Sequence, residues 1–114
     1  MVNYAQGWQN LRAAVNTLAG TGDQKQRLES AIILNMSGIK PAPDLPPEIR
    51  EDFIAFMRQM CSQRTHDSEG AVWEMIRQMG RLERQQAVMR IIDFYDVVNR
   101  AIGSGAKVAT ECLK

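Results

Sequence analysis

The chain has 114 residues, the size of one domain that can bury its own core without metal or disulfide staples. Its hydrophobic content of 45% is that of a globular protein and excludes wholesale disorder. The 14 basic and 13 acidic residues leave a net charge of +1, so the overall charge does not favour nucleic acid or a membrane surface as the partner.

The N-terminal segment and the cysteines indicate the compartment. Met1 to Gln6 contain neither a basic segment nor an apolar run, so they do not predict a signal peptide. No apolar stretch approaches the roughly 18 residues that a membrane-spanning helix needs. The two cysteines, Cys61 and Cys112, make no disulfide framework. We therefore expect a cytoplasmic protein with reduced thiols and no membrane contact.

The first predicted element is an amphipathic helix over about residues 3–19. Its apolar residues recur at steps of four and three, and they are Tyr4, Trp8, Leu11, Val15 and Leu18. Gly20 to Gly22 end the helix, because Gly readily adopts the left-handed conformation of a C-cap. Asp23 then predicts the N-cap of a second helix, and Gln26 three residues later completes a capping-box pair.

The second helix is predicted to run to about Met36, burying Leu28, Ala31 and Ile32 before it stops at Gly38. All four prolines follow, between Pro41 and Pro47. Pro43 and Pro46 formally make a PxxP ligand, but a stiff connector that pre-sets the next helix is the simpler interpretation. A third apolar stripe then contains Ile49, Phe53, Phe56 and Met60.

The longest predicted element runs from Ser68 to Ile102 and carries two apolar stripes. The first comprises Val72, Met75, Ile76, Met79 and Leu82, and the second comprises Val88, Ile91, Ile92, Tyr95, Val98 and Ile102. At about 100° per residue, the second stripe lies roughly 120–180° around the axis from the first. We expect a break or sharp bend within residues 79–84, where Gly80 is a usable C-terminal cap. Alternatively, the helix is straight and Met75, Met79 and Leu82 form a dimer face on a second copy of the chain.

These elements predict an all-α fold, a compact bundle of four or five helices with short connections. The bundle is expected to form a single domain over residues 1–102, followed by a mobile tail over residues 103–114. One core should contain the residues on the apolar stripes, among them Trp8, Leu11, Phe53, Phe56, Ile91 and Tyr95.

Few residues suggest chemistry. His66, the only histidine, follows Cys61 by five residues in a polar connector, so a solvated histidine is a simpler interpretation than a Cys–His pair. One His and two distant Cys do not supply a metal site, and no motif predicts a cofactor. Asp93 and Asp96 lie on one helix face and are the basis of an enzyme hypothesis, in which Tyr95 could take part. Ion pairs with Arg90 and Arg100 are the simpler interpretation of both carboxylates.

The basic residues of the long element offer a second alternative. Arg77, Arg81 and Arg84 share one helix face, and Arg90 follows them. Such a face can contact a protein partner or the phosphates of a nucleic acid. However, no aromatic residue interleaves with these arginines. Nucleic-acid binding therefore remains an alternative.

The favoured hypothesis is a non-enzymatic helical interaction or adaptor module that associates with itself, as a homodimer. It is based on the displaced stripes and on the six internal methionines, since methionine adapts to varied partners.

Overall fold

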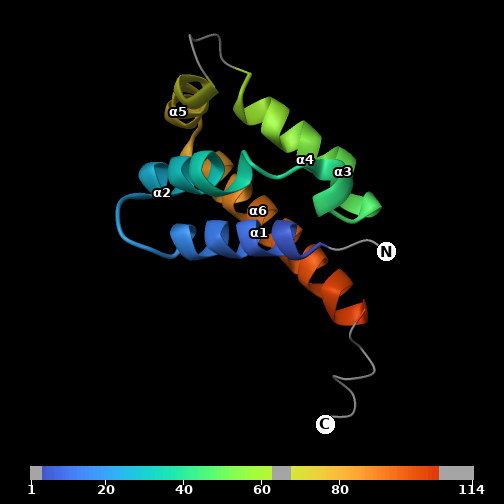
Figure 1. Cartoon of the computed structure of the whole chain (residues 1–114). Helices are drawn as coiled ribbons and strands as arrows, with labels where there is room; N and C mark the ends of the chain where they lie inside the picture. The colour runs from blue at the N-terminus through green and yellow to red at the C-terminus, as the bar shows by residue number, and fades with distance from the viewer. Residues whose placement is uncertain (1–3, 63–67, 106–114) are drawn as a thin grey trace.

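The computed structural model describes residues 4–62 and 68–105, and all its elements are helical (Figure 1). They are α1 (Ala5–Leu18), α2 (Gln24–Ser30), the π-helix η1 (Ala31–Met36), α3 (Pro41–Asp44), α4 (Pro47–Met60), α5 (Ser68–Gln78) and α6 (Arg81–Gly105). The predicted all-α bundle is confirmed. Five of these helices have seven residues or more, and the one-turn α3 is an element that the sequence did not predict.

Helices α1 and α2 form an antiparallel pair that crosses in front of α6 in Figure 1. Gly22 turns the chain between them with a φ of 97°, a conformation that favours glycine. The predicted capping box is present, because Gln26 N donates to Asp23 Oδ1 at 2.9 Å and Asp23 N donates to Gln26 Oε1 at 3.3 Å. Local sequence therefore specifies both the turn of the α1–α2 hairpin and the start of its second helix.

Helix α2 continues directly into η1, where backbone hydrogen bonds span five residues, as from Ser37 N to Ile32 O at 3.0 Å. The Asn35 side chain donates to Thr17 Oγ1 at 3.0 Å and so fastens η1 to α1. Ile32 and Met36 of η1 are fully buried, whereas Leu34 remains 76% exposed.

The Pro-rich segment is a packed element rather than an accessible ligand. Asp44, which is 9% exposed, accepts a hydrogen bond from Lys40 N at 2.8 Å and so closes the turn of α3. Arg50 Nε of α4 donates to the carbonyls of Pro41 at 3.1 Å and Leu45 at 2.8 Å. Pro46 is buried at the start of α4, so a PxxP groove could not reach both prolines of the motif.

The predicted break in the long element is confirmed, because α5 ends at Gln78 and α6 begins at Arg81. The predicted role of Gly80 as a C-cap in the left-handed conformation is wrong. Among the described residues only Gly22 has a positive φ. Gly80 instead stands at the N-cap of α6: its carbonyl accepts from Arg84 N at 2.9 Å, and its N–H donates to Glu83 Oε1 at 3.0 Å.

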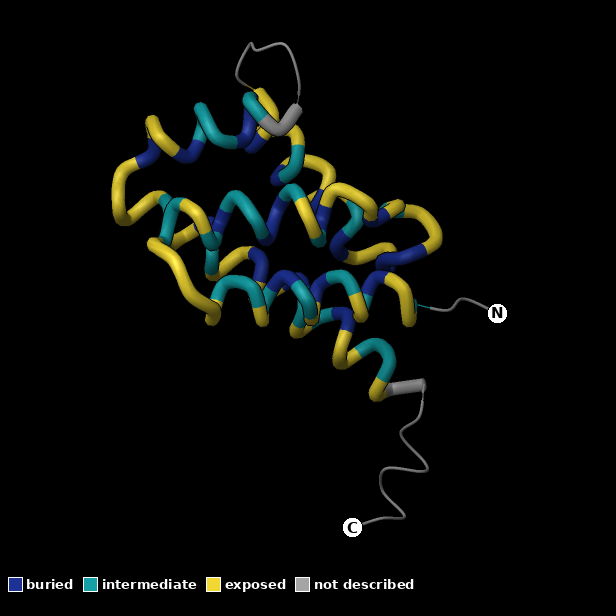
Figure 2. The backbone as a smooth tube through the Cα atoms, turned by 60° about the vertical axis from the view of Figure 1, so that its left-hand side comes forward, coloured by how far each residue is buried: buried dark blue, intermediate teal, exposed yellow. Residues whose placement is uncertain are grey.

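One continuous core connects all the longer helices, and Figure 2 shows its buried residues on the inner side of each. Its largest fully buried side chains are Leu11, Leu28, Ile32, Met36, Leu45, Met60, Val72, Ile76, Ile91 and Val98. Of the predicted core, Leu11, Phe53, Phe56 and Ile91 are buried.

The remaining two predicted core residues, Trp8 and Tyr95, are half-buried at the edge of the core. Their ring centroids are 6.3 Å apart, and Trp8 Nε1 donates to Asn99 Oδ1 at 3.0 Å. Phe94 takes the central place instead, edge-on to Phe53 at 5.6 Å and to Phe56 at 5.7 Å.

The C-terminal boundary differs from the prediction. Helix α6 continues through Gly103 to Gly105, so the first three residues of the predicted tail are helical, and residues 106–114 lie outside the described part of the chain. Of the helices that the structure describes, none has the length and apolar character needed to cross a bilayer.

Candidate functional site

The candidate site is the solvent-facing side of the first half of α6, which we call the outer α6 face. It comprises Leu82, Gln85, Gln86, Met89, Arg90 and Ile92. Leu82 is 68% exposed, Met89 52% and Ile92 37%. Leu82 and Met89 are seven residues apart, about two turns, and so project from the same side of the helix. The opposite side of α6 is fixed in the core by Ala87, Ile91, Phe94 and Val98.

The outer α6 face is hollowed rather than flat. Leu82, Gln85, Gln86, Met89 and Arg90 line a shallow depression of about 470 Å³. A second hollow, of about 260 Å³, lies where α4, the end of α5 and α6 meet, and its lining comprises Phe56, Gln59, Met60, Met79, Glu83, Gln86, Ala87 and Arg90. Gln86 and Arg90 line both hollows, which therefore adjoin.

Arg90 is held at this junction by an aromatic ring. Its guanidinium carbon lies 5.6 Å from the centroid of Phe94, a cation–π arrangement. The predicted ion pair of Arg90 with Asp93 is absent from the described residues, and Asp93 is exposed to solvent. The guanidinium is exposed, so it can still meet a carboxylate on a partner.

The four arginines proposed as a basic face do not form one surface, because the break separates them. Arg77 lies on α5 and pairs with Glu74 at 3.6 Å. Arg84 is part of the fold: its Nε donates to Gln24 Oε1 of α2 at 2.9 Å, and its Nη1 donates to the Met79 carbonyl at the end of α5. Of the four, Arg81 and Arg90 are the ones that are exposed on α6.

The three residues proposed as a dimer face are also divided. Met79 is 7% exposed and belongs to the chain's own core, and Met75 is half-buried against that core. Leu82 alone is exposed, because the break places it on the outer side of α6. Its neighbour Met89 was not predicted as part of this face, although the spacing of seven residues was a usable signal.

The carboxylates proposed for an enzyme stand in solvent. Asp93 and Asp96 are exposed on α6, and Asp96 pairs with Arg100 at 3.3 Å, as predicted. Both lie outside the linings of the two hollows. Within residues 4–62 and 68–105, no three His, Cys, Asp or Glu side chains come together as a metal site would require.

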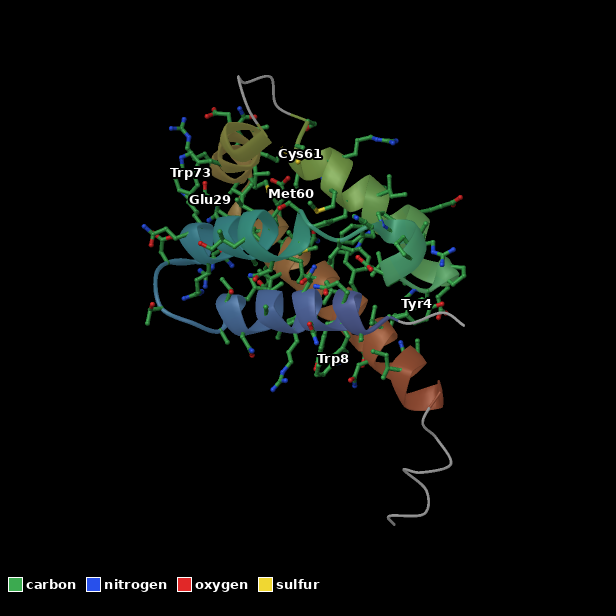
Figure 3. The ribbon with its side chains drawn as sticks, in the orientation of Figure 1. Tyr4, Trp8, Glu29, Met60, Cys61 and Trp73 are labelled. Carbon is green, nitrogen blue, oxygen red and sulfur yellow. The ribbon has the colours of Figure 1, made fainter. Side chains whose placement is uncertain are left out.

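Cys61 lies at the C-terminal end of α4, beside Met60 (Figure 3). The residue is exposed, but partial burial raises the pKa of its thiol above the ordinary value. A raised pKa leaves less thiolate at neutral pH, which makes Cys61 a poor nucleophile. His66 and Cys112 lie outside the described residues.

Among the described residues, two other large apolar side chains are exposed, both away from α6. Leu34 stands on η1 beside a depression of about 210 Å³ that Glu29, Ser30 and Ile33 also line. Ile54 of α4, 38% exposed, borders a third groove of about 360 Å³. Neither lining shares a residue with the two hollows of α6. Comparison of the chain with protein-family models, with curated proteins and with solved structures gives no match.

Proposed function

We propose that this protein is a small non-enzymatic interaction module that binds a protein partner, a second copy included, through the outer α6 face. The observation that carries the proposal is the exposure of Leu82 and Met89 side by side on a helix whose other side is fixed in the core. Burying the exposed parts of these two side chains would contribute on the order of 1–2 kcal/mol each. Polar residues beside them, Gln85, Gln86 and Arg90, resemble the rim of a protein interface.

The alternatives have weaker support. Nucleic-acid binding was based on four arginines, but Arg84 is engaged within the fold and Arg77 lies on a different helix. An enzyme based on Asp93 and Asp96 would need these groups in a concave, partly desolvated site, whereas both are exposed.

The compartment that we propose is the cytoplasm. Cys61 is an exposed free thiol, and such thiols persist where glutathione and thioredoxin keep cysteines reduced.

Sedimentation equilibrium at several protein concentrations tests the function. We expect the wild-type mass to rise with concentration, and Leu82→Glu and Met89→Glu each to shift the protein towards the monomer, because each introduces a charge into the apolar contact. Both residues are exposed, so circular dichroism should show an unchanged fold and melting temperature within a few degrees.

Leu34→Glu is the matched control. Leu34 is 76% exposed, more than Leu82, but it stands on η1 outside the outer α6 face. We expect it to leave the association unchanged. A wild-type protein that stays monomeric at all concentrations, or an equal effect of Leu34→Glu, would contradict self-association through this face.

A further inference from the structure

The groove that Ile54 borders has a mainly apolar lining. It lies between α4 and the segment that joins η1 to α3 (Figure 1). Its volume of about 360 Å³ falls within the range of about 300–1,000 Å³ that small-molecule sites occupy. We call it the α4 groove, and its apolar lining residues are Met36, Ile39, Pro41, Phe53, Ile54 and Met57.

The α4 groove is built on the hydrophobic core. Met36, Ile39 and Phe53 are buried members of that core, whereas Met57 is half-buried and Ile54 is exposed. The buried residues fix the position of the groove, and the more exposed ones offer apolar surface to a ligand. Such a groove exists before any ligand arrives, so binding would not require the helices to separate.

The polar part of the lining consists of Ser37 and Arg58. The Ser37 hydroxyl donates to the carbonyl of Ile33 at 2.6 Å, so its proton is engaged within the fold. Arg58 is exposed and forms no ion pair with another described residue. The positions three and four residues before and after it carry no acid. The lining therefore has one charge, a guanidinium that can still accept a carboxylate partner.

That charge lies at one end of the groove. Pro41 marks the other end, because its carbonyl accepts from Arg50 Nε at 3.1 Å, near the start of α4. Arg58 follows Arg50 by eight residues on the same helix, a rise of about 12 Å at 1.5 Å per residue. The apolar side chains of Ile54 and Met57 lie between these two levels.

The lining favours an alkyl chain over a peptide. An extended peptide would bring a backbone N–H and C=O at each residue against walls that offer few hydrogen-bond partners. A helix satisfies its own backbone, but its diameter of about 10–12 Å is too large for this groove to hold. An alkyl chain has no polar group to satisfy, and a single carboxylate at its end matches the planar fork of one guanidinium.

We propose that the α4 groove binds a fatty carboxylate, with its carboxylate on Arg58 and its alkyl chain extending over Met57 and Ile54 towards Pro41. This site is separate from the outer α6 face, with which it shares no lining residue. The inference therefore goes beyond the proposed function and does not depend on it.

Hexanoate and 1-hexanol, which have the same number of carbons, test the role of Arg58. In titrations followed by the NMR signals of the Ile54 and Met57 methyl groups, we expect hexanoate to give saturable shifts in the millimolar range. Arg58→Gln should weaken hexanoate binding about three- to tenfold, as expected for an exposed ion pair. It should leave the binding of 1-hexanol unchanged, because the alcohol has no charge to pair. Comparing both ligands on both proteins isolates the contact between the two charges.

Two matched variants separate this contact from general changes in charge or surface. Arg81→Gln removes an exposed arginine from α6, outside the groove, and should leave hexanoate binding unchanged. Ile54→Glu places a carboxylate in the groove and should abolish binding. Leu34→Glu makes the same kind of change outside the lining and should have no effect. Circular dichroism of each variant should show an unchanged fold.

The chain length of the ligand tests the apolar part of the site. From butanoate to octanoate, affinity should rise by up to about fourfold for each methylene that enters the groove. An affinity that does not rise with chain length would overturn the proposal. So would the absence of saturable shifts in the wild type, or an Arg58→Gln variant that binds hexanoate as well as the wild type does.

Discussion

At the scale of single residues, Gly7 determines how closely the N-terminal helix approaches the Pro-rich turn. A Cβ atom on Gly7 would lie 2.2 Å from the carbonyl oxygen of Asp44, which is a backbone atom held within α3. Neither helix can yield through a side-chain rotation, so any side chain here must push α1 and α3 apart. The glycine was not singled out from the sequence, because its role depends on a segment 37 residues away.

Gly7→Ala should therefore lower the free energy of unfolding by about 2–3 kcal/mol, as overpacking typically does, although alanine is the better helix former by about 1 kcal/mol. Gly38→Ala is the control, since a Cβ at Gly38 meets nothing within 4 Å and its φ is not positive. We expect it to be neutral or stabilising by a few tenths of a kcal/mol. Urea denaturation of both variants checks the contrast, and equal stabilities would show that α3 moves freely.

Phe94 is the aromatic centre of the contact between α4 and α6. It is 3% exposed and meets Phe53 and Phe56 edge-on. Phe94→Ala should destabilise the protein by about 3–5 kcal/mol, through lost burial and the cavity that it leaves. Ile92→Ala, on the exposed side of the same helix, should cost much less. Thermal unfolding that leaves Phe94→Ala at the wild-type melting temperature would remove this residue from the core.

At the scale of elements, the break between α5 and α6 explains the two displaced apolar stripes. The periodicity favoured a break, because a straight helix would have its two stripes on opposite sides of its axis and would need different neighbours to cover them. The role of Gly80 in the break could not be predicted from the sequence. A glycine that caps the end of α5 and a glycine that caps the start of α6 would look the same in the sequence. Only the hydrogen bond from Gly80 N to Glu83 identifies Gly80 as the N-cap of α6.

The cap offers a test at this scale. Glu83 already supplies half of a capping box, so Gly80→Ser would supply the missing hydroxyl acceptor. Gly80→Ala differs from it by that oxygen alone. We expect the Ser variant to be more stable than the Ala variant by about 0.5–2 kcal/mol in thermal or urea unfolding. If the two variants unfold together, Gly80 is not the N-cap of α6.

Other elements show which features cannot be predicted from sequence periodicity. The prolines were assigned to a connector because proline usually ends helices, yet Pro41 begins the one-turn α3. Trp8 and Tyr95 lie on the predicted stripes but at the margin of the core, where Trp8 keeps a hydrogen bond to Asn99. An apolar stripe predicts which side of a helix is covered. It does not predict how deeply each residue is buried, because that depends on the neighbouring helices.

At the scale of the whole molecule, the fold class was predictable and the candidate site was only partly so. Helical spacing and capping residues are local, so the all-α bundle and the start of α2 followed from the sequence. The exposed surface depends on the orientation of α6 after the break. In that orientation Met79 is buried while Leu82 and Met89 are exposed, and neither composition nor spacing predicts this difference.

The packing of α1 against α6 has a consequence for the synthesis of the chain. These helices are far apart in the sequence, and α1 packs against α6 as well as against α2 and η1. On a translating ribosome, α1 emerges before α6. Leu11 and Ala14 of α1, which are buried in the folded protein, therefore remain uncovered by α6 until it has been synthesised. The α1–α2 hairpin can form early, but the completed core requires α6, so folding is expected to finish only after α6 has left the exit tunnel.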